Sequence, residues 1–203
     1  MPSTETPTGM LPVKRLNGRP YNGGLSHYNI ANSTTHNIFF GDPVQLQSGF
    51  IRRVTAADGA DAIGVFMGCY YVDPNSKQPT WKSYYPANTS STGKVEGRPN
   101  PVAMVCDDPD MVFKVQANAS VTVADIGLNF NVTVSAGNTT FGMSRAHLVA
   151  SSRASAAENG VRLVGFYDIP GNDPSNEDTA NTKPIVLVMF NNHQLRRDLV
   201  STS

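Results

Sequence analysis

Three carboxylates within four residues form the densest group of potential chemistry in the chain: Asp107, Asp108 and Asp110. Several carboxylate oxygens in one place are what a Ca²⁺ ion requires, so a metal site, or a metal-dependent hydrolase built on it, is one interpretation. The spacing differs from that of a calcium loop, and no Glu follows at the required offset. Asp and Pro are common turn residues, so we expect a tight turn here. Normal behaviour after changing all three to Asn would exclude the enzyme.

Other catalytic arrangements are not recognisable in the sequence. The four histidines, His27, His36, His147 and His193, are isolated, and no HExxH or Gly-x-Ser-x-Gly pattern occurs. The two cysteines, Cys69 and Cys106, lie inside apolar runs, where we expect buried, reduced thiols with raised pKa values. A disulfide between them requires that their strands be neighbours. We therefore expect no catalytic residue, no metal, no cofactor and no enzyme activity.

The composition favours contacts between proteins. Of the 203 residues, 39% are hydrophobic, but only 16% are charged, and 16 acids balance 16 bases. Without a net field, neither nucleic acid nor an anionic membrane is an expected partner. No stretch reaches the length of about 20 apolar residues that a membrane span needs. The remaining polar surface must be rich in amides and hydroxyls, which lose little when another neutral surface covers them.

Short apolar runs, rich in β-branched and aromatic residues and punctuated by turn residues, predict strands rather than helices. In the first half we expect strands at 38–40 and 44–50, a hairpin from 63–72 to 80–85, and another hairpin from 102–106 to 111–115. In the second half we expect strands at 121–123, 130–134, 161–167 and 185–190. A short helix capped by Ser144 is a weaker alternative within 141–159. We find no internal repeat and no clear linker.

These runs predict a mainly β fold with little helix: a compact β-sandwich or β-barrel-like core with an extended N-terminal arm. The expected parts are the arm at 1–36, a β core at 37–117, and a second β portion at 118–203 that packs on the core and ends in a short polar tail.

The first 36 residues lack periodicity and contain four prolines, at positions 2, 7, 12 and 20. A disordered terminus is one interpretation. The segment is nevertheless apolar enough to need a cover, and ordering about thirty irregular residues costs on the order of 1 kcal/mol each. We therefore expect an arm that becomes ordered against a neighbouring subunit. On that basis, removal of residues 1–36 leaves a folded protein.

Two surface features have alternative interpretations. The aromatic residues Tyr70, Tyr71, Trp81, Tyr84 and Tyr85 stabilise a hairpin in one interpretation and stack sugars or another subunit in the other. The paired arginines either are solvated or contact an acidic patch on a partner. The residues expected to touch a partner are Leu11, Val13, Arg15, Leu16, Tyr21, Tyr28, Arg52, Arg53, Arg196 and Arg197.

Several short motifs between residues 38 and 195 carry a resemblance to a known family. They are Gly41-Asp42-Pro43-Val44, Gly64-Val65-Phe66-x-Gly68-Cys69-x-Tyr71, Trp81 with Tyr84-Tyr85-Pro86, Asp108-Pro109-Asp110 with Phe113-x-Val115-Gln116-Ala117, and Gly142-x-Ser144. With these motifs the chain resembles structural proteins of tailed bacteriophages that are encoded beside the major capsid protein, and β-domain proteins that cement or decorate phage heads.

The resemblance implies a virion component on the capsid surface, assembled in the host cytoplasm. Its partners would be the major capsid protein and further copies of itself, as a dimer or trimer at local symmetry axes. Neighbouring capsid subunits would be clamped from outside. A glycan- or receptor-binding module of a phage fibre or head appendage is the alternative function.

Overall fold

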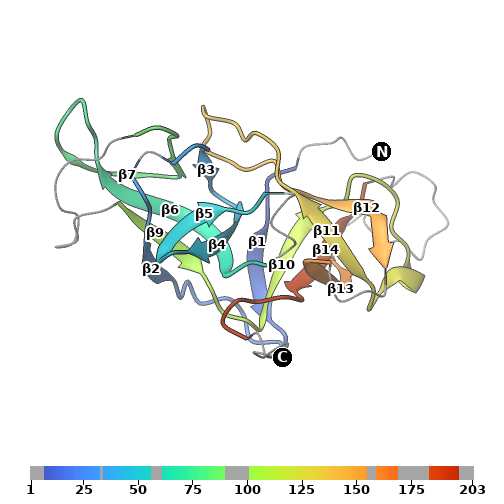
Figure 1. Cartoon of the computed structure of the whole chain (residues 1–203). Helices are drawn as coiled ribbons and strands as arrows, with labels where there is room; N and C mark the ends of the chain where they lie inside the picture. Colours follow the sequence, from blue (N-terminus) through green and yellow to red (C-terminus); the bar gives the residue numbers. More distant parts are fainter. Residues whose placement is uncertain are drawn as a thin grey trace, which may run out of the picture.

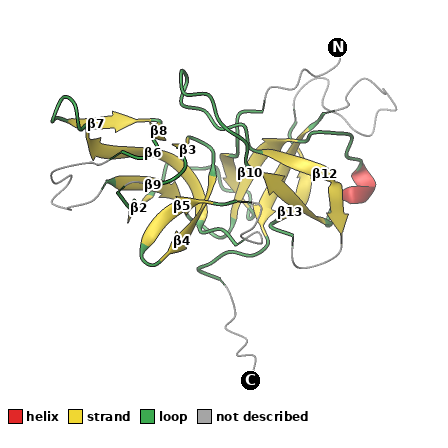
Figure 2. Ribbon diagram, turned by 45° about the horizontal axis from the view of Figure 1, so that its top comes forward, coloured by secondary structure: helices red, strands yellow, loops and turns green. Residues whose placement is uncertain are grey.

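The computed structural model is mainly β, as the sequence predicts. Within the described residues the one helical element is a short 3₁₀ turn, Val123–Asp125. The strands form antiparallel sheets around compact cores, and Figures 1 and 2 show two lobes side by side. The described residues are 7–32, 34–55, 61–89, 101–154, 159–168 and 183–196.

The first lobe is a barrel, which we call barrel 1. Its sheet has the order β2-β9-β6-β4-β5. A parallel bridge between Ile30, just after β2, and Ile51 in β5 closes the sheet on itself. The strands are β2 (Ser26–Asn29), β4 (Pro43–Gln47), β5 (Phe50–Arg53), β6 (Gly64–Val72) and β9 (Val102–Cys106).

The second lobe, barrel 2, closes in the same way. Its sheet has the order β10-β14-β13-β11-β12, and Ala117, just after β10, forms a parallel bridge with Leu148 in β12. The additional strand β1 (Leu11–Arg15) pairs with β10. The barrel strands are β10 (Met111–Gln116), β11 (Asn129–Thr133), β12 (His147–Ala154), β13 (Val161–Phe166) and β14 (Ile185–Phe190).

The two barrels share one topology, so the expectation of no internal repeat is wrong at the level of structure. When the strands of each barrel are numbered in chain order, neighbouring strands around both barrels follow the order 1-5-4-2-3, and the third strand closes on the first. The details agree as well. The N–H of Ile30 donates to the carbonyl of Pro101 at 2.8 Å, and that of Ala117 donates to Pro184 at 2.9 Å. Each proline directly precedes the fifth strand.

Faint traces of this repeat are present in the sequence. Residues 53–58 read Arg-Val-Thr-Ala-Ala-Asp, and residues 153–158 read Arg-Ala-Ser-Ala-Ala-Glu, each starting at the end of the third strand. Gly68 and Gly165 both occur in a Gly-x-Tyr triplet of the fourth strand, beside an irregularity in its pairing with the fifth. The register shift thus occurs in the same strand pair of both barrels, and a β-bulge there bends the strand locally.

Apolar side chains fill both barrels and the junction between them. The core of barrel 1 includes Ile51, Phe66 and Tyr71. The core of barrel 2 extends into barrel 1 through Val54 and Val65, so that one apolar cluster spans both lobes. Because continuous burial of this kind is typical of one packed unit, we expect the two barrels to move together.

A buried polar contact also joins the barrels. Asp42 precedes β4 in barrel 1, and its Oδ1 accepts a hydrogen bond of 2.5 Å from Oγ of Ser144, in the β11–β12 connection of barrel 2. Both side chains are fully buried. Gly9 packs against them with a φ of +79°, and a Cβ there would lie 2.6 Å from Cβ of Ser144. The N-terminal segment is therefore part of this junction.

The expectation that residues 1–36 form an arm that needs another subunit is wrong for the described part, 7–32 and 34–36. The segment is extended, but it lies on its own chain: β1 pairs with β10, and β2 is a strand of barrel 1. Met10 and Ile30 are fully buried. The apolar residues that predicted a foreign cover are covered by the two barrels.

Other differences concern which strands pair. The hairpin from β6 to β7 (Pro79–Lys82) is confirmed, but β9 and β10 belong to different barrels instead of one hairpin. The division therefore falls between β9 and β10, before Ala117. The run 44–50 is not one strand: Ser48 and Gly49, with φ of 50° and 82°, turn β4 into β5 as a two-residue hairpin.

Three shorter stretches also differ or add detail. Residues 121–123 are not a strand but lead into the 3₁₀ turn, and the helix considered within 141–159 is replaced by β12. The short strands β3 (Ile38–Phe39) and β8 (Tyr84–Tyr85) form a small separate pair.

Candidate functional site

The acidic turn between the two barrels binds the terminal segments of the chain. Asp107 accepts hydrogen bonds from Oγ of Ser26 at 2.8 Å and from the hydroxyl of Tyr28 at 2.6 Å. Asp108 forms an ion pair with Nε of Arg15 at 2.6 Å. Asp110 pairs with Arg196 at 2.7 Å. Each carboxylate thus has a partner from β1, β2 or the segment after β14.

These contacts change the interpretation of three residues expected to touch a partner protein. Arg15, Tyr28 and Arg196 use their polar atoms within the chain, on the acidic turn. The turn predicted from Asp and Pro is confirmed by the backbone hydrogen bond from Met111 to Asp108. Within the described residues no group of three or more His, Cys, Asp or Glu side chains is placed to hold a metal ion.

The other N-terminal residues of the expected contact set lie at different depths. Leu11 and Val13 of β1 are half-buried, and Tyr21 packs against the core of barrel 2. Leu16 is 52% exposed, so of these four it offers the most surface to a partner. Arg197 lies outside the described residues.

Most of the aromatic cluster packs internally. The rings of Tyr71 and Tyr85 meet edge to face at 5.5 Å, and Tyr84 stacks on Phe39 at 5.4 Å. Trp81 differs, because its ring covers Gly68 on one side and it remains 49% exposed. Tyr71, Tyr84 and Tyr85 therefore pack internally, whereas Trp81 provides an exposed apolar surface.

Both thiols are free and buried, as predicted. Burial raises the pKa of Cys69 and of Cys106 to about 12. The two residues lie in paired strands, β6 and β9, but at different levels: Cys69 is opposite Ala103, and Cys106 is opposite Val65. A thiol with so high a pKa is almost entirely protonated at neutral pH and is a poor nucleophile.

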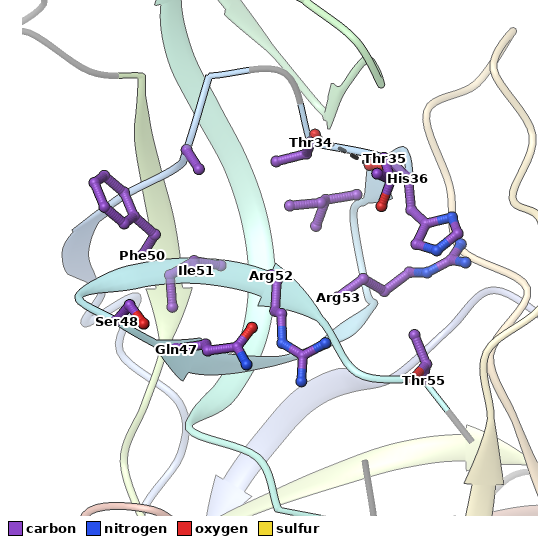
Figure 3. Close-up of a pocket in the computed structure, with 12 residues that line it drawn as sticks. Thr34, Thr35, His36, Gln47, Ser48, Phe50, Ile51, Arg52, Arg53 and Thr55 are labelled. Carbon is purple, nitrogen blue, oxygen red and sulfur yellow. Dashed lines mark hydrogen bonds between the residues drawn. The ribbon is translucent and has the colours of Figure 1, made fainter. Parts of the chain in front are cut away.

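The open cavity beside β5 combines cationic and hydroxyl groups (Figure 3). It has a volume of about 590 Å³ and lies between β5 and the segment after β2. Both β5 arginines line it, and no Asp or Glu is among its described lining residues. The polar lining groups that Figure 3 labels are Thr34, Thr35, His36, Gln47, Ser48, Arg52, Arg53 and Thr55.

The repeat gives Arg53 of this cavity a counterpart in barrel 2. Asp42 lies directly before β4 and Asp125 shortly before β11, and each carboxylate accepts a 2.8 Å hydrogen bond from the N–H three residues earlier. In barrel 2, Arg153 binds Asp125 at 3.0 Å. In barrel 1, the hydroxyl of Ser144, instead of an arginine, donates a hydrogen bond to Asp42. Arg53 forms no ion pair with a described carboxylate. Its Nε is buried without a hydrogen-bond acceptor in the described part of the chain.

Asp42 is consequently a poorly compensated buried acid. Burial raises its pKa from 3.8 to about 6, while the bonds from Ser144 and the Phe39 N–H and the charge of Arg53 act in the opposite direction. The proton is bound more tightly in the folded chain than in the unfolded one, so stability conferred by this group is complete below pH 3.8 and falls as the pH rises through 6.

This gives a prediction for the variant Asp42→Asn. An amide cannot ionise; its oxygen can still accept from the Phe39 N–H, while its NH₂ group would donate to Oγ of Ser144, which reverses that bond. Between pH 4 and pH 7 we expect the wild type to lose about 2 kcal/mol of unfolding free energy relative to the variant. Urea unfolding of both proteins at several pH values measures the difference. Parallel stability curves would show that Asp42 does not titrate in this range.

Sequence reasoning selected Arg52 and Arg53 but missed the rest of the cavity. Its opposite wall comes from a segment that lacks periodicity, and only the folded chain brings it beside β5. The match between residues 53–58 and 153–158 was the available signal. This match aligns Arg53 with Arg153, two arginines that have different partners in the folded chain.

Two general comparisons complete the description of the site. Within the described part of the chain, no helix has the length and apolarity to span a membrane. A scan against protein-family models, a search of curated proteins and a search of solved structures each give no match to this chain.

Proposed function

We propose that this protein is a structural component of a tailed-phage virion that binds the outside of the assembled capsid and cements neighbouring capsid subunits. The observation that carries the proposal is a rigid body with large apolar side chains exposed at separate places. Phe141 is 71% exposed, Leu195 58%, Leu16 52% and Trp81 49%. A cementing protein needs such spaced contact points, because one continuous patch would grip a single neighbour.

The positions of the segments that carry these residues fit this requirement. Figure 1 places the β6–β7 hairpin, the β11–β12 connection and the segment after β14 on different sides of the molecule. Leu16 and Leu195 are both held at Asp110. The N–H of Leu16 donates to the Asp110 carbonyl, and Arg196, the residue after Leu195, pairs with the Asp110 carboxylate. The sequence resemblance and the low charge support the same function.

Cementing follows from mass action. A subunit that bridges several neighbours binds only the assembled shell, so each bound copy stabilises the shell relative to its free parts. Individual contacts can be weak, because the second contact of a bound copy forms at a high effective concentration. A dimer or trimer of the protein would multiply the contacts further.

The test uses shells assembled from the major capsid protein of the phage that encodes this chain. We expect the purified protein to sediment with the shells and to raise their disruption temperature. Phe141→Ser and Leu195→Ser should each weaken binding about tenfold, and the pair more than either alone. Both variants should keep the wild-type unfolding free energy within about 0.5 kcal/mol, since the side chains are exposed.

Failure of the wild-type protein to sediment with shells would contradict the proposal. The alternative, a glycan- or receptor-binding module, rests on the exposed ring of Trp81, because sugars stack on aromatic faces. That function requires glycan-array binding that Trp81→Ala removes. Shell binding without glycan binding would exclude it.

A further inference from the structure

The cavity beside β5 has the properties of a site for an anion. Two arginines line it and no described acid does, so the charged groups of its lining are cationic although the chain as a whole is neutral. Threonine and serine hydroxyls supply further donors. The volume of about 590 Å³ exceeds what a single ion fills and suits one or two amino-acid side chains.

The internal repeat indicates which arginine is available. In barrel 2 the charge of Arg153 is used on Asp125, at 3.0 Å. In barrel 1 the Ser144 hydroxyl takes the corresponding place on Asp42, and the Arg53 guanidinium lies in the cavity wall without a described ion-pair partner. The buried Asp42 compensates this charge only in part, since it forms no ion pair with Arg53, and an incoming anion that binds Arg53 directly would lower the cost of burying the cation.

We propose that this cavity binds a carboxylate side chain of a partner polypeptide, and that Arg53 is the residue that receives it. A guanidinium matches a carboxylate in shape and can bind both of its oxygens. The cavity also has an apolar wall, where the half-buried Phe50 is accessible and the core residues Ile38 and Ile51 lie behind it. That wall suits the methylene stem of a Glu better than a sugar that is hydroxylated all round.

The binding experiment uses the full-length protein and a short oligoglutamate peptide with blocked ends. Isothermal titration at low salt measures its affinity, and an oligoglutamine peptide of equal length is the uncharged control. We expect binding of oligoglutamate only. Arg53→Gln should weaken binding by about tenfold or more, which is the effect of losing one charge-assisted pair.

Arg153→Gln is the matched control, because it removes the equivalent arginine of the other barrel. It should lower the unfolding midpoint, since it leaves the buried Asp125 without its partner, and it should leave oligoglutamate affinity unchanged. Asp42→Asn provides a second test that does not depend on the folding of the Arg53 variant. Removing that competing negative charge should keep or increase the affinity.

Two results would overturn the proposal. One is oligoglutamate binding that Arg53→Gln leaves unchanged. The other is no oligoglutamate binding by the wild type; if an oligoglucuronate then binds through Arg53, the site is assigned to acidic glycans. The identification of the partner polypeptide as a capsid subunit rests on the proposed function; the binding of a carboxylate by Arg53 does not. Because the peptide assay contains no shells, its failure is distinguishable from failure of shell binding.

Discussion

Deletion of residues 1–16 is expected to abolish stable folding, although these residues lack periodicity in the sequence. The deletion removes the fully buried Met10, the whole of β1 and the Arg15–Asp108 ion pair. Truncation of a buried Met alone typically costs 2–5 kcal/mol, so we expect a total loss of at least about 5 kcal/mol of unfolding free energy. Domains of this size have about 5–15 kcal/mol in total. Urea unfolding, or its absence, measures the result.

The control is deletion of residues 2–6, which keeps Met10 and β1. It should retain a cooperative unfolding transition. The longer deletion should also promote association, because it uncovers the edge of β10 that β1 now pairs with. If the protein without residues 1–16 unfolds at the same urea concentration as the full chain, β1 is not integral to barrel 2.

Gly64→Ala is expected to be the most damaging single methyl addition in barrel 1. A Cβ at Gly64 would overlap the carbonyl oxygen of Cys106 and lie 2.9 Å from the Asp107 Cα. These are backbone atoms of the paired strand and of the acidic turn, so no side chain can rotate away. Relief requires β6 and β9 to separate, and we expect a loss of about 3–5 kcal/mol. Thermal and urea unfolding measure it.

Gly165→Ala in β13 is the matched control. It is in the corresponding fourth strand of barrel 2, and a Cβ there meets no atom within 4 Å. We expect a change within about 1 kcal/mol. Equal effects of the two substitutions would show that the cost arises from chain entropy rather than from the contact with Cys106.

Individual strands were predictable because local patterns define them. The runs at 63–72, 102–106 and 185–190 are apolar and β-branched over most of their length, and each is a strand. The two cysteines were correctly placed as buried thiols for the same reason. The Ser48–Gly49 turn was missed although Ser-Gly is a turn signal, because apolar residues continue on both sides of it; the positive φ angles show the two-residue turn.

Strand pairing was less predictable, because it depends on contacts distant in the sequence. The four residues between β9 and β10 have the length of a hairpin turn, yet the two strands diverge into different barrels. Likewise, the N-terminal segment was predicted to require another subunit because nothing local covers it. Its cover comes from β9 and β10, roughly 75 to 100 residues later in the chain.

The candidate site was predictable only in part. Adjacent arginines identify a cationic position, and Arg52 and Arg53 both line the cavity. Arg196, from the other arginine pair, and Arg15, from the N-terminal arm, were also expected to contact a partner but are paired with the acidic turn. Which arginine has a partner within the chain depends on where Asp42, Asp108 and Asp110 lie in space, and composition carries no information on that.

The pairing of β1 with β10 has a consequence for the order of folding during synthesis. Barrel 1 uses residues 26–106, and barrel 2 uses 111–190, so the first can form while the second is still being translated. β1 emerges from the ribosome before either of them, yet it has no sheet partner until β10 has been made. Among the described strands, β1 is therefore made first, and it docks only after about a hundred further residues have been added and barrel 1 is complete.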